Sequence, residues 1–304
     1  MTSSSDASVV ERALAAARET DALLAVVGPT ASGKTDLAIA LAERLGGEIV
    51  SADSIQIYRA FDVGSGKPSG EELARAPHHL VGALDPLAPI DAAAWADLAA
   101  TAVADIRARG RVPIVCGGTF FWVRTLLFGL ADAPAGDAAL RARHREIADV
   151  EGRAALHERL RAVDPESAAR LHPNDLVRVS RALEVHALSG RKLSDWQRDH
   201  AFASVHHPAR LLGVARDAAA LTERIRARTA AWLARGWVEE VESLLARGYG
   251  EARAMGSVGY AEVRAMLRGD LPRAELEDAI VRATRVFARR QRTWLRRADV
   301  TWLG

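Results

Sequence analysis

The chain has 304 residues, of which 49% are hydrophobic and 26% are charged, and its formal net charge is +2. This length and apolar content suit a globular protein with a sizeable core, built as one large domain or a domain with an insert. No apolar run approaches the roughly 20 residues that span a bilayer, and the Ser-rich start lacks a secretory pattern. The one cysteine, Cys116, excludes an internal disulfide and a multi-cysteine zinc site. We therefore expect a cytoplasmic protein that does not enter the membrane.

A glycine-rich segment follows the first predicted strand, Ala22–Val27, and precedes a helix-patterned stretch, Leu37–Leu45. It has the form G-x-x-x-x-G-K-T, and a strand, glycine-rich loop and helix in this order are the setting of a phosphate-binding P-loop. Lys34 is expected to reach the outer phosphate and the Thr35 hydroxyl to bind Mg²⁺. The loop alone leaves open whether ATP or another diphosphate is bound. The predicted diphosphate-binding residues are Gly28, Pro29, Thr30, Ala31, Ser32, Gly33, Lys34 and Thr35.

Polar residues follow the second predicted strand, Glu48–Ser51. Asp53 lies at the carboxyl end of this strand, where side chains of an open α/β sheet face the ligand crevice. Two roles fit it, a Mg²⁺ ligand as in nucleotide hydrolases or a general base. Further along, the paired residues His78 and His79 have no other ligand at metal spacing, so we expect them to be structural.

Two glycines and Thr119 follow the third predicted strand, Val112–Cys116. Glycines at a strand end allow the backbone to approach a ligand closely. The Thr119 hydroxyl is placed to donate to a diphosphate oxygen or to cap the next helix, and both roles can coexist. Cys116 has no visible setting that would lower its pKa, so we expect a small core residue.

Strands and helices alternate along most of the chain, which predicts an α/β fold with a parallel, P-loop NTPase-like sheet flanked by helices. Residues 137–200 are helical throughout by pattern, with breaks at Asp164-Pro165 and at residues 172–175. A fourth strand, Leu211–Ala215, precedes three long helices, Ala218–Ala234, Val238–Arg247 and Arg273–Arg296. We therefore expect a P-loop core at residues 20–136, an all-helical insertion domain at 137–205, and the rest of the core at 206–304.

These segments together resemble the tRNA dimethylallyltransferase family, and the absence of the zinc finger of eukaryotic members indicates the bacterial type. The order of the motifs makes the resemblance specific over nearly the whole chain. The matching segments are GPTASGKT at 28–35, SADSIQIYR at 51–59, DVGSGKP at 62–68, PHHL at 77–80, CGGT at 116–119, DPESAARLHPND at 164–175, RVSRALEV at 178–185, SVGY at 257–260 and TRVFARRQRTWLR at 284–296.

The resemblance implies transfer of a dimethylallyl group from dimethylallyl diphosphate to N6 of adenosine 37, in tRNAs that read codons beginning with U. The P-loop then holds the diphosphate of the prenyl donor, with Mg²⁺ on Thr35. In the family the aspartate that matches Asp53 activates the adenine amine, and the arginine that matches Arg228 grips the diphosphate. The implied catalytic residues are Asp53, Thr119, Lys34 and Arg228.

Contacts with the tRNA anticodon stem–loop are implied in the same way, and we expect a monomer. The implied contacts include part of the insertion domain and the arginine-rich C-terminal helix. Clustered arginines of this kind bind phosphates with salt-sensitive affinity. The implied tRNA-contacting residues are Asp53, Ser54, Ile55, Gln56, Thr119, Arg141, Val177, Arg178, Val179, Ser180, Arg181, Arg253, Ala254, Met255, Gly256, Ser257, Val258, Arg289, Arg290, Gln291, Arg292, Thr293, Trp294, Leu295 and Arg296.

Three alternatives remain on the sequence. A P-loop kinase of small metabolites explains the loop and Mg²⁺ but not the basic helix or the helical insert. An adenylate prenyltransferase acting on free nucleotides shares the donor and the chemistry. Only the basic helix and the helical insert distinguish a tRNA enzyme from it. A non-catalytic RNA-binding module conflicts with the presence of Lys34, Thr35, Asp53 and Thr119.

Overall fold

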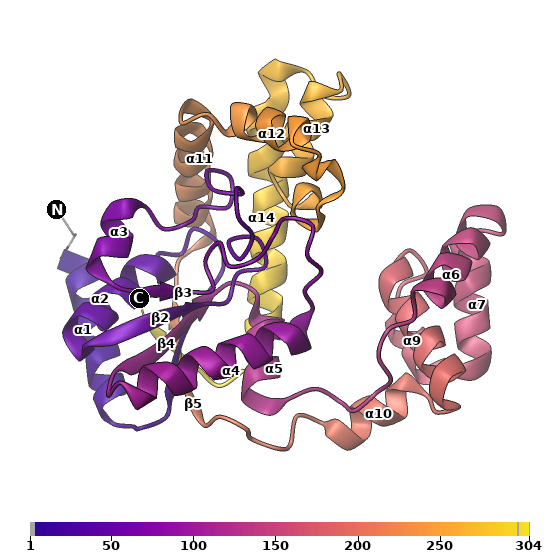
Figure 1. The fold of residues 1–304 in the computed structure, drawn as a ribbon, viewed down its shortest axis with the longest axis horizontal. Coiled ribbons are helices and arrows are strands. Elements are labelled where there is room, and N and C mark those ends of the chain that lie inside the picture. The colour runs from indigo at the N-terminus through magenta and orange to yellow at the C-terminus, as the bar shows by residue number, and fades with distance from the viewer. Residues whose placement is uncertain (1–3, 297, 304) are drawn as a thin grey trace. The chain divides into compact units, whose positions relative to one another are not determined.

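The computed structural model describes residues 4–296 and 298–303 (Figure 1). Two compact units divide the chain. The described residues up to Leu127 form the first unit together with those from His206 onward, and Phe128–Val205 form the second. Because the first unit is interrupted by the second, the helical segment is an insertion in an α/β core.

A single parallel sheet organises the first unit, with the strand order β3-β2-β4-β1-β5-β6. The strands that the structure describes are β1 Leu23–Val27, β2 Gly47–Ser51, β3 His78–His79, β4 Val112–Gly117, β5 Ala209–Val214 and β6 Val300–Leu303. The four predicted strands and the parallel sheet are confirmed. The sequence analysis missed the edge strands β3 and β6, because two or four residues carry too little periodicity to stand out.

Helices cover both faces of the sheet. The chain moves one way along the strand order from β1 to β2, and the opposite way from β3 to β4. Since crossovers between parallel strands are right-handed, the connecting helices α2 and α4 lie on opposite faces. The helices of this unit are α1 Ser4–Arg18, α2 Lys34–Leu45, α3 Gly70–Arg75, α4 Ala92–Ala108, α5 Phe120–Phe128, α11 Ala218–Ala234, α12 Trp237–Ala246, α13 Tyr260–Leu267 and α14 Leu276–Leu295, with short 3₁₀ turns at Tyr249–Glu251, Arg253–Gly256 and Arg273–Glu275.

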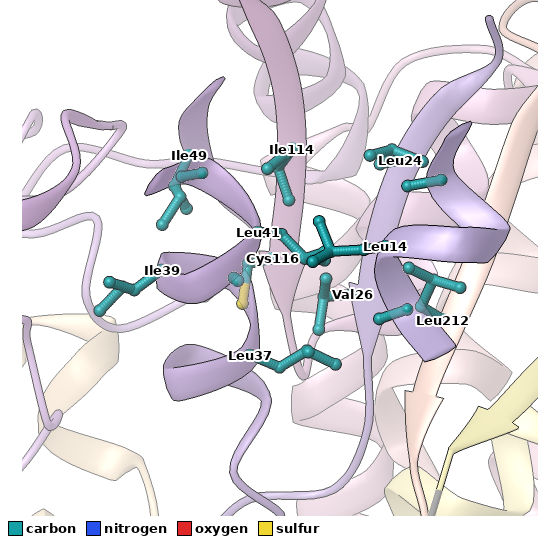
Figure 2. Close-up of a cluster of buried hydrophobic side chains, with 14 of the residues drawn as sticks. Leu14, Leu24, Val26, Leu37, Ile39, Leu41, Ile49, Ile114, Cys116 and Leu212 are labelled. Carbon is teal, nitrogen blue, oxygen red and sulfur yellow. The ribbon is translucent and has the colours of Figure 1, made fainter. Parts of the chain in front are cut away.

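The main core lies between the sheet and the pair α1 and α2, as Figure 2 shows. Alternate strand residues such as Val26, Ile114 and Leu212 point to this face, because side chains of a strand alternate between the two sides. Leu14 of α1 and Leu41 of α2 meet them, and each is at most 1% exposed. The helix α1, which the sequence analysis does not predict, therefore belongs to the core.

A second apolar cluster joins α11 and α14 to the loop after β1. Leu221 and Ile225 of α11 pack with Val281 and Ala288 of α14, and the methyl group of Ala31 packs against them. On α14 the buried positions Thr284, Ala288, Gln291 and Leu295 recur at the three- and four-residue spacing of one helix face. The predicted C-terminal helix is confirmed, with its first turn as a separate 3₁₀ turn.

The second unit is helical throughout its assigned elements. They are α6 Ala138–Val150, α7 Arg153–Val163, α8 Pro165–Arg170, α9 Leu176–Ser189 and α10 Leu193–His200. The predicted breaks hold, since Asp164 and Asp175 are N-cap residues whose side chains accept from Ser167 and Arg178 N–H groups. Leu156, Leu160 and Val179 form its core. Among the described residues, no helix of the protein has the length and apolar character needed to cross a bilayer.

A buried carboxylate gives the first testable prediction. Glu48 of β2 is 3% exposed and accepts hydrogen bonds from Arg109 and His79, and the bond to Arg109 lowers its pKa to about 2. Because the pKa is lower in the folded state than in the unfolded state, the ionised carboxylate stabilises the fold above about pH 4.5. This contribution is lost as the pH falls toward 2. We expect Glu48→Gln to lower the free energy of unfolding at pH 7 by about 2–3 kcal/mol. The difference in this free energy between parent and variant should become smaller below pH 4.5.

Urea unfolding across that pH range measures this effect. Glu43→Gln is the matched control, because Glu43 pairs with Arg75 at the surface, and we expect it to cost under about 1 kcal/mol. Equal unfolding free energies for Glu48→Gln and the parent at pH 7 would contradict the assignment.

Candidate active site

The loop between β1 and α2 has the geometry of an anion-binding loop. Gly33, the N-cap residue of α2, has φ 97° and no side chain that caps the helix. The first N–H groups of α2 therefore stay open to an anion, and the helix dipole favours negative charge there. Ala31 has φ 64°, a strained value for alanine that its packing against α11 and α14 holds in place.

Two arginines fix the direction of the loop's peptide groups. Arg216 Nε donates to the Ser32 carbonyl and Arg224 Nε to the Ala31 carbonyl, both at 2.8 Å. Both guanidinium groups lie beside Gly33, the N-cap residue of α2. The negative ends of these dipoles are thus neutralised by cations, and the region in front of α2 stays positive.

A pocket of about 80 Å³ opens beside this loop at the carboxyl ends of β1, β2 and β4. It brings together most of the predicted catalytic groups, namely Lys34, Asp53 and Arg228, with Thr35 beside them. Thr119 is anchored at its edge, because the Thr119 N–H donates to the Ala52 carbonyl at 3.1 Å. The remaining lining residues are Thr30, Ala38, Ile49, Ser51, Gln56, Ser65, Gly66, Pro68, His78, Cys116, Gly117 and Trp232.

The two cations of the pocket are partly removed from water. Burial lowers the pKa of Lys34, and the Asp53 carboxylate opposes that effect. Burial also lowers the pKa of Arg228 to about 10, with Asp53 again opposing and Arg224 adding to the shift. Arg228 Nη2 donates to the Thr30 hydroxyl at 2.7 Å and its guanidinium lies 4.5 Å from the Trp232 ring centroid. Its Nε is buried without a partner among the described residues, which suits a bound anion.

Asp53 is held by the backbone that follows it. Its Oδ1 accepts from the N–H groups of Ile55, at 2.9 Å, and Gln56, at 3.2 Å. Both bonds use Oδ1, so Oδ2 is the oxygen left to accept a proton from a ligand. The neighbouring Ser54 N–H donates to the Thr119 hydroxyl oxygen at 3.2 Å. This bond occupies an acceptor site of Thr119 and leaves the hydroxyl proton for donation.

The segment Asp62–Pro68 covers one side of the pocket and is clamped from outside. The Glu240 carboxylate accepts from the N–H groups of Asp62, Val63 and Gly64, and from the Tyr260 hydroxyl. Gln56 Nε2 donates to the Gly66 carbonyl at 2.9 Å. Gly64 lies against Trp237 so closely that a Cβ atom would come within 1.7 Å of Nε1. Only glycine fits at this contact.

Three smaller points concern the histidines, metal ligands and the cysteine. His78 and His79 form β3, and their rings bond to the Ala76 carbonyl and to Glu48. His78 also lines the pocket, and its Nε2 is buried without a partner among the described residues. No cluster of His, Cys, Asp and Glu among the described residues is arranged for a metal ion. Cys116 is buried in the main core, and burial raises the pKa of its thiol to about 12.

Gly117 and Gly118 stand at the end of β4, and Gly117 lines the pocket. They admit close approach of protein groups: a Cβ on Gly117 would lie 2.1 Å from the Ala52 carbonyl oxygen, and one on Gly118 would lie 2.3 Å from Gln291 Nε2. The tight contacts at this strand end are therefore with the chain itself.

The residues expected to contact tRNA divide by exposure. Exposed side chains on α14 include Arg289, Arg292 and Arg296, which continue from Arg285 at helical spacing and form a stripe roughly 16 Å long. Within the described part of the chain this arginine stripe has no salt bridge to an acidic residue. Six of the expected side chains are buried and pack the interior instead. They are Val179, Ser180, Ala254, Met255, Gln291 and Leu295.

In the helical unit, two of the residues expected to contact tRNA are bonded to a buried glutamate. Glu184 is fully buried and accepts from Arg141 and Arg181. Both arginines keep part of their side chain exposed, 49% and 31%. Arg178 and Val177 are exposed at the start of α9, and Val177 reaches 80%. Sequence matching did not show that Gln291 is buried, and it omitted Arg216 and Arg224, because arginine is common throughout this chain.

An uncapped helix N-terminus, two partly desolvated cations and an adjacent carboxylate define a P-loop enzyme site with the features of an anion-binding site. The IPP transferase family model matches residues 56–298, and the Isopentenyl transferase model matches residues 21–80. The chain therefore belongs to the IPP transferase family, whose curated members carry the name tRNA dimethylallyltransferase.

Named relatives and solved structures agree with this membership. The tRNA dimethylallyltransferase of Sorangium cellulosum is 67% identical, over 93% of this chain and 90% of that protein. That of Myxococcus xanthus is 49% identical, over 90% and 89%. The tRNA isopentenylpyrophosphate transferase of Bacillus halodurans has a TM-score of 0.68 at 34% identity, over 93% of this chain and 89% of that one. A eukaryotic dimethylallyltransferase acting on tRNA has a TM-score of 0.75 at 26% identity, over 92% and 73%.

The tight contact at Gly64 gives a second prediction. We expect Gly64→Ala to displace the covering segment, because Trp237 is fixed in the core, and to cost about 1–3 kcal/mol of stability. Gly70→Ala is the control, since nothing lies within 4 Å of its added Cβ. Thermal unfolding and the affinity for inorganic diphosphate measure both variants. A Gly64→Ala protein equal to Gly70→Ala in both properties would contradict the packing argument.

Proposed function

We propose that this protein transfers a dimethylallyl group from dimethylallyl diphosphate to N6 of adenosine 37 of tRNA. The observation that carries the proposal is the pocket that holds Lys34, Arg228 and Asp53 together beside the P-loop. Cations on one side suit a departing diphosphate, and a carboxylate within the same pocket suits an acceptor that must lose a proton.

The reaction breaks the allylic C–O bond and forms a C–N bond to adenine. The electron pair of the C–O bond leaves with the diphosphate, where Lys34, Arg228 and the α2 N–H groups stabilise the growing charge. The N6 amine loses one proton, and Asp53 Oδ2 accepts it. The Thr119 hydroxyl donates to a diphosphate oxygen. Because the target base is stacked in the anticodon loop, it must turn out of the stack to enter the pocket.

A magnesium ion fits the oxygen groups of this pocket. The Thr35 hydroxyl is a hard donor, and the described residues offer no cage of several acidic side chains. Mg²⁺ is bound in this manner where substrate phosphates and water complete its coordination. When bound, the ion would supply further charge neutralisation on the diphosphate. Thr35 is the residue that would hold it.

The tRNA surface is proposed to include the arginine stripe of α14 and, in the helical unit, Arg141, Arg178 and Arg181. The stripe supports this role because its guanidinium groups are exposed and lack acidic partners among the described residues. Phosphate contacts of this kind position the RNA and are sensitive to salt. A tRNA substrate supports a cytoplasmic location for the enzyme.

The role of Asp53 gives a third prediction. Asp53→Asn keeps the Oδ1 acceptor that holds Ile55 and Gln56 but loses the basic oxygen. We expect turnover to fall about 10²–10⁴-fold, with stem–loop and donor affinities near those of the parent. Mass analysis of tRNA after incubation with dimethylallyl diphosphate and Mg²⁺ measures the transfer. Unchanged turnover would exclude Asp53 as the base. Phosphate transfer from labelled ATP to a small acceptor would favour a kinase instead.

The arginine stripe and its neighbour Arg290 give a fourth prediction. We expect Arg290→Ala to weaken stem–loop binding and to reduce the slope of log affinity against log salt by about one, because one phosphate contact is lost. Arg44→Ala is the charge-matched control, since Arg44 lies on α2 and pairs with Glu11 of α1. Binding titrations from low to moderate salt distinguish the two variants. An Arg290→Ala slope equal to that of Arg44→Ala would refute the contact.

A further inference from the structure

Gln291 of α14 makes two bonds that join separate walls of the site. Its Oε1 accepts from the Thr30 N–H at 2.8 Å, and its Nε2 donates to the Gly118 carbonyl at 2.9 Å. The residue is 8% exposed and lies on the buried face of the helix. Thr30 belongs to the P-loop, and Gly118 immediately precedes Thr119. One amide therefore fixes the loop that grips the diphosphate and the segment that presents the Thr119 hydroxyl.

The two bonds require this side chain. The amide supplies an acceptor and a donor from one rigid group, whereas a glutamate at this length would lack the donor and an alkyl chain would lack both. Removing it would leave a partly buried N–H and a carbonyl without partners, which costs more than a simple hydrogen bond. The fit is close, because a Cβ on Gly118 would lie 2.3 Å from Nε2.

The helix that carries Gln291 also carries the proposed RNA-binding surface. Arg289, Arg290 and Arg292 are exposed on either side of it in the chain. One helical turn before Gln291, Ala288 packs in the cluster that holds Ala31 of the P-loop. If RNA bound on the exposed side moved α14, the movement would be transmitted to the P-loop by two contacts. One is the polar contact of Gln291 with Thr30, and the other is the apolar contact of Ala288 with Ala31.

We propose that Gln291 is a positioning residue that couples tRNA binding on α14 to diphosphate affinity in the P-loop. This inference rests on the proposed function, since it takes the arginine stripe as the RNA surface. Coupling between two ligands is reciprocal, so RNA that orders α14 strengthens diphosphate binding, and diphosphate strengthens RNA binding by the same factor.

The test measures the affinity for inorganic diphosphate, with Mg²⁺, in the presence and absence of a saturating anticodon stem–loop. In the parent protein we expect the stem–loop to raise diphosphate affinity by about 5-fold or more. In Gln291→Met, which keeps the length and removes both polar atoms, we expect about tenfold weaker diphosphate binding without RNA. The stem–loop factor should fall to about one in this variant, and the affinity for stem–loop alone should stay unchanged.

Thr284→Val is the matched control. Thr284 lies on the same buried face of α14, but its hydroxyl bonds to the Ile280 carbonyl of its own helix. This variant should lose stability without losing the stem–loop factor. Hydrogen exchange of the peptide that contains Thr30 gives a second readout, and its amide should exchange faster in Gln291→Met only. If Gln291→Met folds poorly, Gln291→Glu serves in its place, because it retains the acceptor and removes the donor.

The outcomes separate the two hypotheses. A parent protein that binds the stem–loop with no change in diphosphate affinity would overturn the coupling. So would a Gln291→Met protein with the parental factor, or with parental diphosphate affinity in the absence of RNA. A parent protein that fails to bind the stem–loop at all would instead contradict the proposed tRNA surface.

Discussion

The site depends on the direction in which the P-loop peptide groups point. A loop after β1 has no intrinsic reason to adopt one set of peptide directions, because strand and helix constrain only its ends. Arg216 and Arg224 hold two of these carbonyls, and Gln291 holds the N–H of Thr30. These three side chains belong to the last third of the chain. The P-loop of the first 35 residues is therefore completed by a loop and two helices that follow the insertion.

Desolvated charge explains how such a site favours a diphosphate. Lys34 and Arg228 are partly removed from water before any ligand binds, and the lowered pKa of each records that cost. Asp53 offsets part of it. In the proposed reaction a diphosphate would offset the rest, and as negative charge grew on the leaving group the same cations would gain interaction without rearranging. The proton acceptor and the anion site thus stabilise each other's charges.

The sequence predicts those parts of the protein whose signals are local. The strand, glycine loop and helix around Lys34 and the helical character of residues 137–200 are confirmed in the structure, and Asp53 lies in the same pocket as Lys34. Signals that depend on tertiary pairing were missed: β3 and β6 become strands only beside longer neighbours. Gln291 was assigned to RNA because a segment match does not say which face of a helix a residue occupies. Its place among Thr284, Ala288 and Leu295 at helical spacing was the available signal.

The clamp on the covering segment contrasts with the arginine stripe in its response to ions. Glu240 is satisfied by three peptide N–H groups and the Tyr260 hydroxyl, all uncharged donors, and Trp237 packs against Gly64 without any charge. Screening by dissolved salt acts weakly on such contacts and strongly on exposed guanidinium groups. Ionic strength should therefore affect RNA binding by the arginine stripe without affecting the clamp on the covering segment. A concentration of salt that releases RNA leaves the wall of the donor pocket in place.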